Sequence, residues 1–205
     1  KPMKTRHPEK ANNPINPIRK KPSWIRTKIL DTQNYFKTKE IINKNKLFTV
    51  CQEASCPNIS ECWSKRHATF MIMGDICTRA CSFCNVRTGK PNLLDPFEPI
   101  KIAQATKDLN LKHVVITSVD RDDLKDDYGS DIWAKTINQI HNIVPGCSVE
   151  VLTPDFQGYV PALEKVFNAN PEIFSHNIEC VERISKQVRK QSNWSRSKNV
   201  LKLSV

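Results

Sequence analysis

The chain has 205 residues and carries 32 Lys and Arg against 21 Asp and Glu, which gives a formal net charge of +11 at pH 7. This length suits one domain with its own core plus an appendage, and no apolar run approaches the roughly 18 residues that would cross a bilayer. The basic surface fits a nucleic acid, an anionic membrane or an acidic protein partner, and charge alone does not decide among these.

Residues 1–30 are rich in proline, asparagine and basic side chains and lack apolar periodicity, which predicts an extended or partly disordered arm. This stretch has neither the apolar core of a secretory signal nor the Arg/Ser-rich amphipathic face of a transit peptide. Apolar residues at helical spacing over residues 31–47 then predict a helix.

Six of the eight cysteines lie in two compact triplets, one with the spacing C-x4-C-x5-C and one with the spacing C-x3-C-x2-C. The first triplet is Cys51, Cys56 and Cys62, and the second is Cys77, Cys81 and Cys84. Thiols grouped in this way in a chain without a secretory signal argue against disulfides and predict a cytoplasmic protein. The isolated Cys147 and Cys180 are expected to be buried as small hydrophobic residues.

The second triplet predicts an iron–sulfur site with one open position. Thiolates are the ligands of such clusters, and a cubane has four irons, so three cysteines in one loop leave the fourth iron open. An open position distinguishes a reactive metal centre from a structural one. A zinc knuckle and incidental cysteines are the alternatives, although zinc sites usually pair C-x-x-C units and close at four ligands. The first triplet is a weaker signal, because three such cysteines could bind zinc or nothing.

Strands and helices alternate after the first triplet. Buried strands are predicted at residues 68–73, 113–118, 148–152 and 173–174, and helices at residues 99–109, 130–143, 161–167 and from 181 onward. This alternation indicates βαβ units, and we predict an α/β fold, a partial (β/α) TIM-type barrel of parallel strands with its last units missing. Residues 1–67 would form an N-terminal arm and cluster-binding segment, and residues 68–205 the incomplete barrel.

Polar residues follow the predicted strands, at the ends where the loops of a (β/α) barrel share one face. They occur at residues 120–123, 153–155 and 176–177. Asp122 and Asp123 fit either this face or the N-terminal cap of a helix, and Thr153 and Asp155 receive no role. Arg79, between the second-triplet cysteines, either tunes the charge of a cluster or faces solvent.

The stretch CTRACSFC, residues 77–84, resembles the C-x-x-x-C-x-aromatic-C motif of the radical S-adenosylmethionine (SAM) enzymes. The resemblance implies that Cys77, Cys81 and Cys84 hold a [4Fe-4S] cluster whose open iron binds the methionine part of SAM. It also implies that Phe83 packs near the adenine, and that an electron passed through the cluster releases a 5′-deoxyadenosyl radical.

Longer stretches are similar to lipoyl synthases, in particular CQEASCPNISECW and MIMGDICTRACSFCNVRTG, followed in order by ITSVDRDDL, VEVLTPDF and HNIE. RHPEK and RKKPSWIRTK resemble the N-terminal arm of bacterial members. The likeness implies a second, auxiliary [4Fe-4S] cluster on the first triplet, and contacts of Asn177 and Glu179 with the ribose or methionine part of SAM.

That family inserts two sulfurs, at C6 and C8, into an octanoyl chain attached to a carrier protein, and its auxiliary cluster supplies the sulfur. The implied partners are octanoylated lipoyl carrier domains (E2 subunits of 2-oxoacid dehydrogenases and the glycine cleavage H protein) and a low-potential electron donor, with no nucleic acid and no membrane. Because such carriers tend to be acidic, the basic surface would steer their docking.

The chain also departs from the family pattern. It has no C-terminal R-S-S-Y motif, which supplies the fourth ligand of the auxiliary cluster, and only about four of six βα units are visible. Ser175 and Cys180 replace the usual Asn and Thr. We therefore expect a truncated sequence that, made alone, exposes an unpaired sheet edge, is unstable and lacks sulfur insertion.

Two other functions compete with this one. A methylthiotransferase-like radical SAM enzyme would also explain both triplets, and a metal-bearing module for nucleic acid would explain the cysteines and the charge. The second alternative predicts basic and aromatic residues interleaved on a sheet, and only residues 20–24 have that composition.

Overall fold

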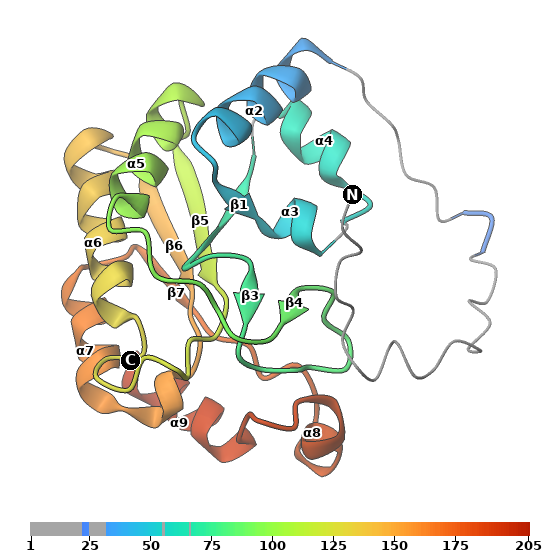
Figure 1. Cartoon of the computed structure of the whole chain (residues 1–205), viewed down its shortest axis with the longest axis vertical. Coiled ribbons are helices and arrows are strands. Elements are labelled where there is room, and N and C mark those ends of the chain that lie inside the picture. The colour runs from blue at the N-terminus through green and yellow to red at the C-terminus, as the bar shows by residue number, and fades with distance from the viewer. Residues whose placement is uncertain (1–21, 25–31, 55, 66) are drawn as a thin grey trace.

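The computed structural model describes residues 22–24, 32–54, 56–65 and 67–205 (Figure 1). The first elements are α2 (Gln33–Lys44), β1 (Phe48–Thr49), α3 (Val50–Glu53) and α4 (Ile59–Ser64). They are followed by β2 (Thr69–Ile72), β3 (Ile76–Cys77), β4 (Arg87–Thr88), α5 (Glu98–Asp108), β5 (His113–Ser118) and α6 (Ser130–Ile143). The last are β6 (Ser148–Leu152), the 3₁₀ helix η1 (Phe156–Gly158), α7 (Val160–Asn168), β7 (Ile173–Ser175), α8 (Glu182–Val188) and α9 (Trp194–Leu203).

The main sheet has five strands in the order β1-β2-β5-β6-β7. β2, β5, β6 and β7 run parallel, and β1 adds an antiparallel strand at the edge beside β2. The predicted α/β fold with a mainly parallel sheet is therefore confirmed. Since parallel strands end at the same edge, the loops after β2, β5, β6 and β7 are brought together there.

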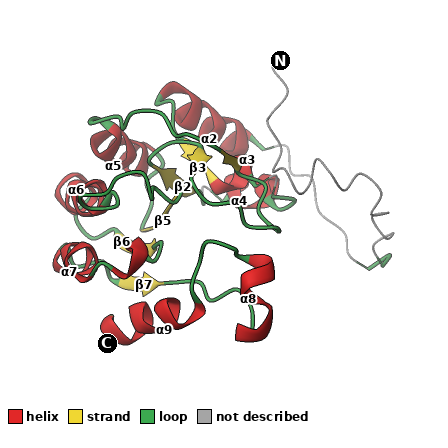
Figure 2. Cartoon of the chain, turned by 60° about the horizontal axis from the view of Figure 1, so that its bottom comes forward, coloured by secondary structure: helices red, strands yellow, loops and turns green. Residues whose placement is uncertain are grey.

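The two faces of the sheet have different neighbours. Phe70, Ile116 and Val151 are buried register partners, so they share one face of the sheet, and α5, α6 and α7 pack in a row against one another. Figure 2 shows these helices along one side of the strands, with α3 and α8 on the other side. Because side chains alternate along a strand, the intervening residues Val115 and Leu152 face away from these helices.

Most of the predicted elements agree with the structure, and the strands at 113–118 and 148–152 and the helix at 130–143 have the predicted bounds. The single helix predicted from residue 181 onward is wrong, because residues 189–193 interrupt it and Asn193 caps the separate helix α9. The two-residue strands β1, β3 and β4 were not predicted, because so short a segment has no periodicity.

Two of the remaining predictions have different outcomes. Cys147 is buried, with 3% of its surface exposed, whereas Cys180 is only partly buried, so the expectation for Cys180 is wrong. Apart from residues 22–24, the predicted arm lies outside the described residues.

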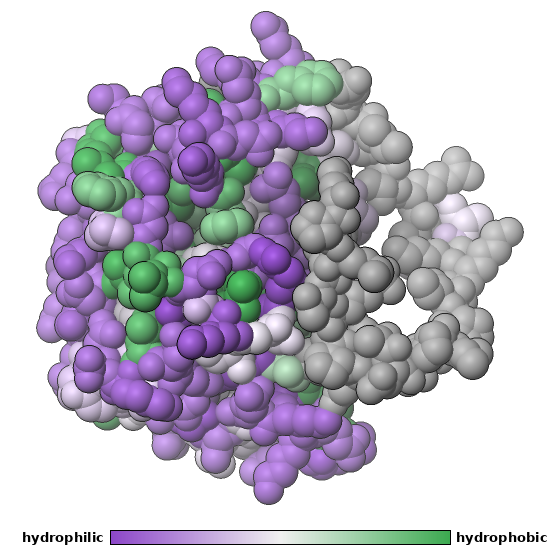
Figure 3. Space-filling view, viewed as in Figure 1, coloured by the Kyte–Doolittle hydropathy of each residue, from purple (hydrophilic) through white to green (hydrophobic). Residues whose placement is uncertain are grey.

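Within the described part of the chain, no helix is both long and apolar enough to cross a bilayer. The face in Figure 3 is largely hydrophilic, with small separate hydrophobic patches.

Candidate active site

A cavity of about 550 Å³ lies at the carboxyl edge of the parallel strands. The cysteines of the second triplet form part of its wall, together with apolar side chains of the sheet and polar residues that follow the strands. Among the residues that line it are Val50, Ala54, Met71, Cys77, Arg79, Cys81, Phe83, Cys84, Val115, Ser118, Asp120, Leu152, Thr153, Asn177, Glu179 and Arg189.

The second-triplet loop, residues 77–84, is held by backbone hydrogen bonds on both sides. Cys77 ends β3, which pairs with β4, and the N–H of Thr78 donates to the carbonyl of Asp120 at 3.1 Å. On the far side, the N–H of Ser82 donates to the carbonyl of Val188 at 2.9 Å, and the N–H of Ala80 donates to Gln191 Oε1 at 2.7 Å. The loop is thus anchored to the end of β5 and to the end of α8.

The three thiols of this loop share one electrostatic environment. Burial raises the pKa of Cys77 to about 12, with Asp120 and Cys84 adding to the effect. Burial also raises the pKa of Cys81, against the opposing charge of Arg189. For Cys77 and Cys81 the neutral thiol is therefore favoured without a metal, and a cation that replaces these two protons would offset the desolvation of the thiolates.

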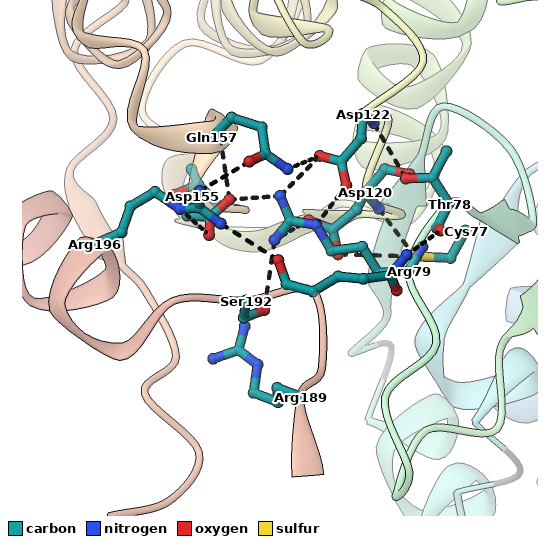
Figure 4. Close-up of polar contacts among 12 residues, drawn as sticks. Cys77, Thr78, Arg79, Asp120, Asp122, Asp155, Gln157, Arg189, Ser192 and Arg196 are labelled. Atoms are coloured by element: carbon teal, nitrogen blue, oxygen red, sulfur yellow. Dashed lines mark hydrogen bonds and ion pairs between the residues drawn. The ribbon is translucent and has the colours of Figure 1, made fainter. Parts of the chain in front are cut away.

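Arg79 lies at the centre of a buried ion-pair network (Figure 4). Its Nε and Nη2 contact the two carboxylate oxygens of Asp122 at 2.7 and 2.8 Å, and Nη2 also contacts Asp155 Oδ1 at 2.6 Å. Its Nη1 lies 3.2 Å from Asp120 Oδ1. Although burial opposes the charged form, the hydrogen bond to Asp122 and the charge of Asp120 raise the pKa of Arg79, so the guanidinium stays ionised.

The network continues from Asp155 into α9. Arg196 Nε donates to Asp155 Oδ2 at 2.8 Å, and its Nη1 donates to Gln157 Oε1, also at 2.8 Å. Gln157 Nε2 donates to Asp122 Oδ1 at 2.8 Å. Burial alone would raise the pKa of Asp155, but the hydrogen bond from Arg79 lowers it overall. Contacts among four separate segments therefore set the position of the second-triplet loop.

Asp120 stands between this network and the cysteines. Its backbone N–H donates to Cys77 Sγ at 3.3 Å, and its Oδ2 lies 3.7 Å from the same sulfur. Desolvation raises the pKa of Asp120 to about 6 in spite of the nearby charge of Arg79. A carboxylate thus lies directly beside a candidate metal ligand.

Asn177 and Glu179 also line the cavity, with Asn177 Nδ2 donating to Glu179 Oε1 at 2.9 Å. Arg189 Nη1 donates to the carbonyl of Asn177 at 2.8 Å. Phe83 also lines the cavity and is 51% exposed. The structure therefore places all three predicted cofactor-contact residues at the same cavity as the second triplet.

The first triplet lies beside this cavity. Cys51 is in α3 and Cys62 is in α4, and Val50 and Ala54 of the same segment line the cavity wall. Asn85 Nδ2 donates to the carbonyl of Glu53 at 3.2 Å, which joins the two cysteine segments. Burial raises the pKa of Cys62, and the charges of Cys51 and Cys56 raise it further. Because such an effect acts only over short distances, the three thiols of the first triplet lie near one another.

The residues present fit a cluster and a polar organic cofactor. Among the described residues, no three His, Cys, Asp or Glu side chains form a group of the kind that holds a single ion. The ligands of a cubane bind different irons and need not converge on one point. Two buried hydroxyl oxygens of the cavity wall, Ser118 Oγ and Thr153 Oγ1, have no hydrogen-bond partner in the described part of the chain, and such groups favour a polar ligand.

A family model decides the classification of the chain. The model of the Radical SAM superfamily matches residues 71–204, which include the second triplet, the four parallel strands apart from the first two residues of β2, and the helices between them. The chain belongs to the radical SAM superfamily. Radical SAM proteins bind SAM and a [4Fe-4S] cluster, and in this chain Cys77, Cys81 and Cys84 are the residues that would hold the cluster. The sequence-based assignment to this superfamily is confirmed.

Three details of the radical SAM site differ from, or were missing in, the sequence-based predictions. The solvent-facing alternative for Arg79 is wrong, because only 3% of the residue is exposed. The capping alternative for Asp122 and Asp123 is also wrong, since α6 begins after Gly129 and these aspartates pair with Arg79 and Arg121. The sequence did not predict that Asp155 pairs with both Arg79 and Arg196. The one sign of such a role in the sequence was its position, as an acidic residue just after a predicted strand.

Proposed function

We propose that this radical SAM protein is a lipoyl synthase, which inserts two sulfurs at C6 and C8 of a protein-bound octanoyl chain. The observation that carries the proposal is the position of the first triplet, whose neighbours Val50 and Ala54 line the cavity that the second-triplet thiols also line. A sulfur source must lie beside the site where a substrate radical forms, because a carbon radical has to be trapped where it is generated.

The cavity wall supports an alkyl substrate. Met71, Val115 and Leu152 line the cavity from the sheet and present apolar surface on which a saturated chain can be buried. The bound cofactor and cluster would supply the radical chemistry that unactivated C–H bonds require. The role of the chain is then to exclude water, hold the acyl chain against this apolar wall and orient the polar end of SAM near Asn177, Glu179 and Arg189.

The remaining parts of the proposal follow the family resemblance. The auxiliary cluster would be a second [4Fe-4S] cluster on Cys51, Cys56 and Cys62, and the sheet would be part of a partial (β/α) barrel. The partners would be octanoylated lipoyl carrier domains and a low-potential electron donor in the cytoplasm. Salt-dependent association with such a carrier would support steering by the basic surface.

The test is anaerobic reconstitution of the protein from its complete reading frame, with iron and sulfide counted for the wild type and for two triple variants. We expect about eight irons per chain in the wild type, and about four after alanine replacement of either triplet. Cys147→Ala is the matched control, since this buried cysteine belongs to neither triplet, and it should retain the wild-type iron content.

A second assay measures activity. It supplies SAM, dithionite and an octanoylated carrier domain, and the product is identified by mass spectrometry. The first-triplet variant should still cleave SAM to 5′-deoxyadenosine but add no sulfur, whereas the second-triplet variant should do neither. Stoichiometric zinc, or sulfur insertion by the first-triplet variant, would contradict the proposal. A methylthiolated product would support the methylthiotransferase alternative.

A further inference from the structure

The charge distribution around Cys77 is uneven. Two backbone N–H groups donate to its sulfur, from Arg79 at 3.4 Å and from Asp120 at 3.3 Å. Such donors stabilise negative charge on a cluster ligand. On the other side, the Cys77 thiol donates to the carboxylate oxygen Oδ2 of Asp120 at 3.7 Å. Once the sulfur is a cluster ligand and has lost this proton, the same carboxylate would oppose additional negative charge there.

The positive charge that could compensate Asp120 is shared. Arg79 contacts Asp122 at 2.7 Å and Asp155 at 2.6 Å, and it contacts Asp120 at the longer distance of 3.2 Å. Arg196, the second arginine of the network, pairs with Asp155 and not with Asp120. Asp120 therefore has the longest contact of the three carboxylates with Arg79, and Arg189 adds a further positive charge that acts on Asp120. The carboxylate that faces Cys77 is thus compensated only in part.

We infer that Asp120 is a tuning residue that lowers the reduction potential of the cluster held by Cys77, Cys81 and Cys84. Reduction adds one electron from a low-potential one-electron donor, and it makes or breaks no bond at the ligands. The added charge is repelled by the adjacent carboxylate, so the reduced state is less stable and is a stronger reductant. The inference depends on the radical SAM assignment and not on sulfur insertion.

The geometry also assigns a supporting role to Arg79. With three carboxylates around one guanidinium, Asp120 contacts Nη1 of Arg79, because Asp122 and Asp155 occupy the Nε and Nη2 donors. Arg79 thus positions the carboxylate and limits its charge, but does not neutralise it. This arrangement distinguishes Asp120 from Asp122, which contacts the same arginine and not the sulfur.

The experiment compares variants in a background in which the first triplet is replaced by alanine, so that one cluster contributes to the signal. Asp120→Asn keeps the size of the side chain and an acceptor for Arg79, and it removes the charge beside Cys77. A redox titration with dithionite, followed by electron paramagnetic resonance, should give a midpoint potential more positive than that of the parent. Asp120→Glu, which keeps the charge, should restore a potential close to that of the parent.

Asp122→Asn is the matched control, because it also removes a carboxylate from Arg79 but leaves the contact between Asp120 and Cys77. Its potential should shift less than that of Asp120→Asn. An unchanged potential in Asp120→Asn with full iron content would overturn the inference, as would an equal shift in Asp122→Asn. If the asparagine variant fails to hold iron, Asp120→Ser, which also removes the charge, decides: a more positive potential supports the inference, and the parent potential contradicts it.

Discussion

The two cysteine segments lie beside one cavity but are stabilised in different ways. The second-triplet loop is held by buried charges, since Arg79 contacts carboxylates that follow β5 and β6. The first-triplet segment consists of a four-residue helix and a six-residue helix. It is held against α2 by packing of the buried Trp63 against Tyr35, with ring centroids 5.5 Å apart, and by the hydrogen bond from Thr38 Oγ1 to the Trp63 carbonyl at 3.1 Å.

This difference has a consequence for preorganisation. Directional ion pairs and hydrogen bonds reach the second-triplet loop at residues 78–80 and 82, between the cysteines themselves. In the first segment the hydrogen bond from Asn85 reaches Glu53, between the first two cysteines, and the buried Trp63 follows the last one. Helices this short have little stability of their own. The second-triplet thiols are therefore positioned by more directional contacts than the thiols of the first triplet.

Replacement of Arg79 should have the largest effect on this comparison. Arg79→Ala leaves three carboxylates facing one another, and loss of one partner from a buried ion pair typically costs about 3–5 kcal/mol. We expect a lower urea midpoint and less iron at the second triplet. Arg183→Ala, at an exposed arginine of α8, is the control and should leave both unchanged. Equal behaviour of the two variants would show that the network does not hold the loop.

Replacement of Trp63 tests the apolar anchor of the first segment. Trp63→Ala removes a fully buried ring and should lower the free energy of unfolding by about 3 kcal/mol, with iron lost mainly from the first triplet. Trp63→Phe should cost less than about 1.5 kcal/mol, because the Trp63 N–H has no partner among the described residues and most of the packing is kept. A large loss of iron from the second triplet instead would contradict this separation.

Glu98 provides a pH-dependent test of the backbone just before the second-triplet loop. Its carboxylate accepts the N–H of Met73 at 2.8 Å, just before the second-triplet loop, and burial raises its pKa from 4.5 to about 7. The folded state therefore binds this proton more tightly than the unfolded state. The contribution to stability is present below about pH 4.5 and is lost as the pH rises through 7, by up to about 3 kcal/mol.

The measurement is the urea midpoint between pH 5 and pH 8. The wild type should lose stability across this range relative to Glu98→Gln, which cannot ionise. Parallel pH profiles for the wild type and Glu98→Gln would exclude the effect.

The smallest effect is expected at the surface of α4. Lys65 pairs with Glu61 at 2.8 Å, one helical turn away, and both side chains are well exposed. Exposed pairs of this kind contribute little, because solvent screens them. Lys65→Ala should leave the melting temperature and the iron content of both triplets unchanged, and a clear loss would mean that surface charge also stabilises this segment.

The sequence was most informative where the signal is local. The strand at 113–118 and the helix at 130–143 were predicted correctly, because burial repeats at intervals of two and 3.6 residues over enough positions to be read. The break between α8 and α9 was missed, because the polar residues 189–193 interrupt the helix through a cap at Asn193 and not through proline or glycine. A cap of this kind resembles many other polar positions in the sequence.

By itself, the sequence determined the chemistry of the second triplet, because its three thiols are separated by a few residues and one loop brings them together. Only the tertiary structure decided the surroundings of that loop. Arg79 meets Asp122 across 43 positions and Asp155 across 76, and Asp155 meets Arg196 across 41. The physical reason is that parallel strands bring their carboxyl ends to one edge, so side chains far apart in the chain become neighbours, and no local pattern records which of them will pair.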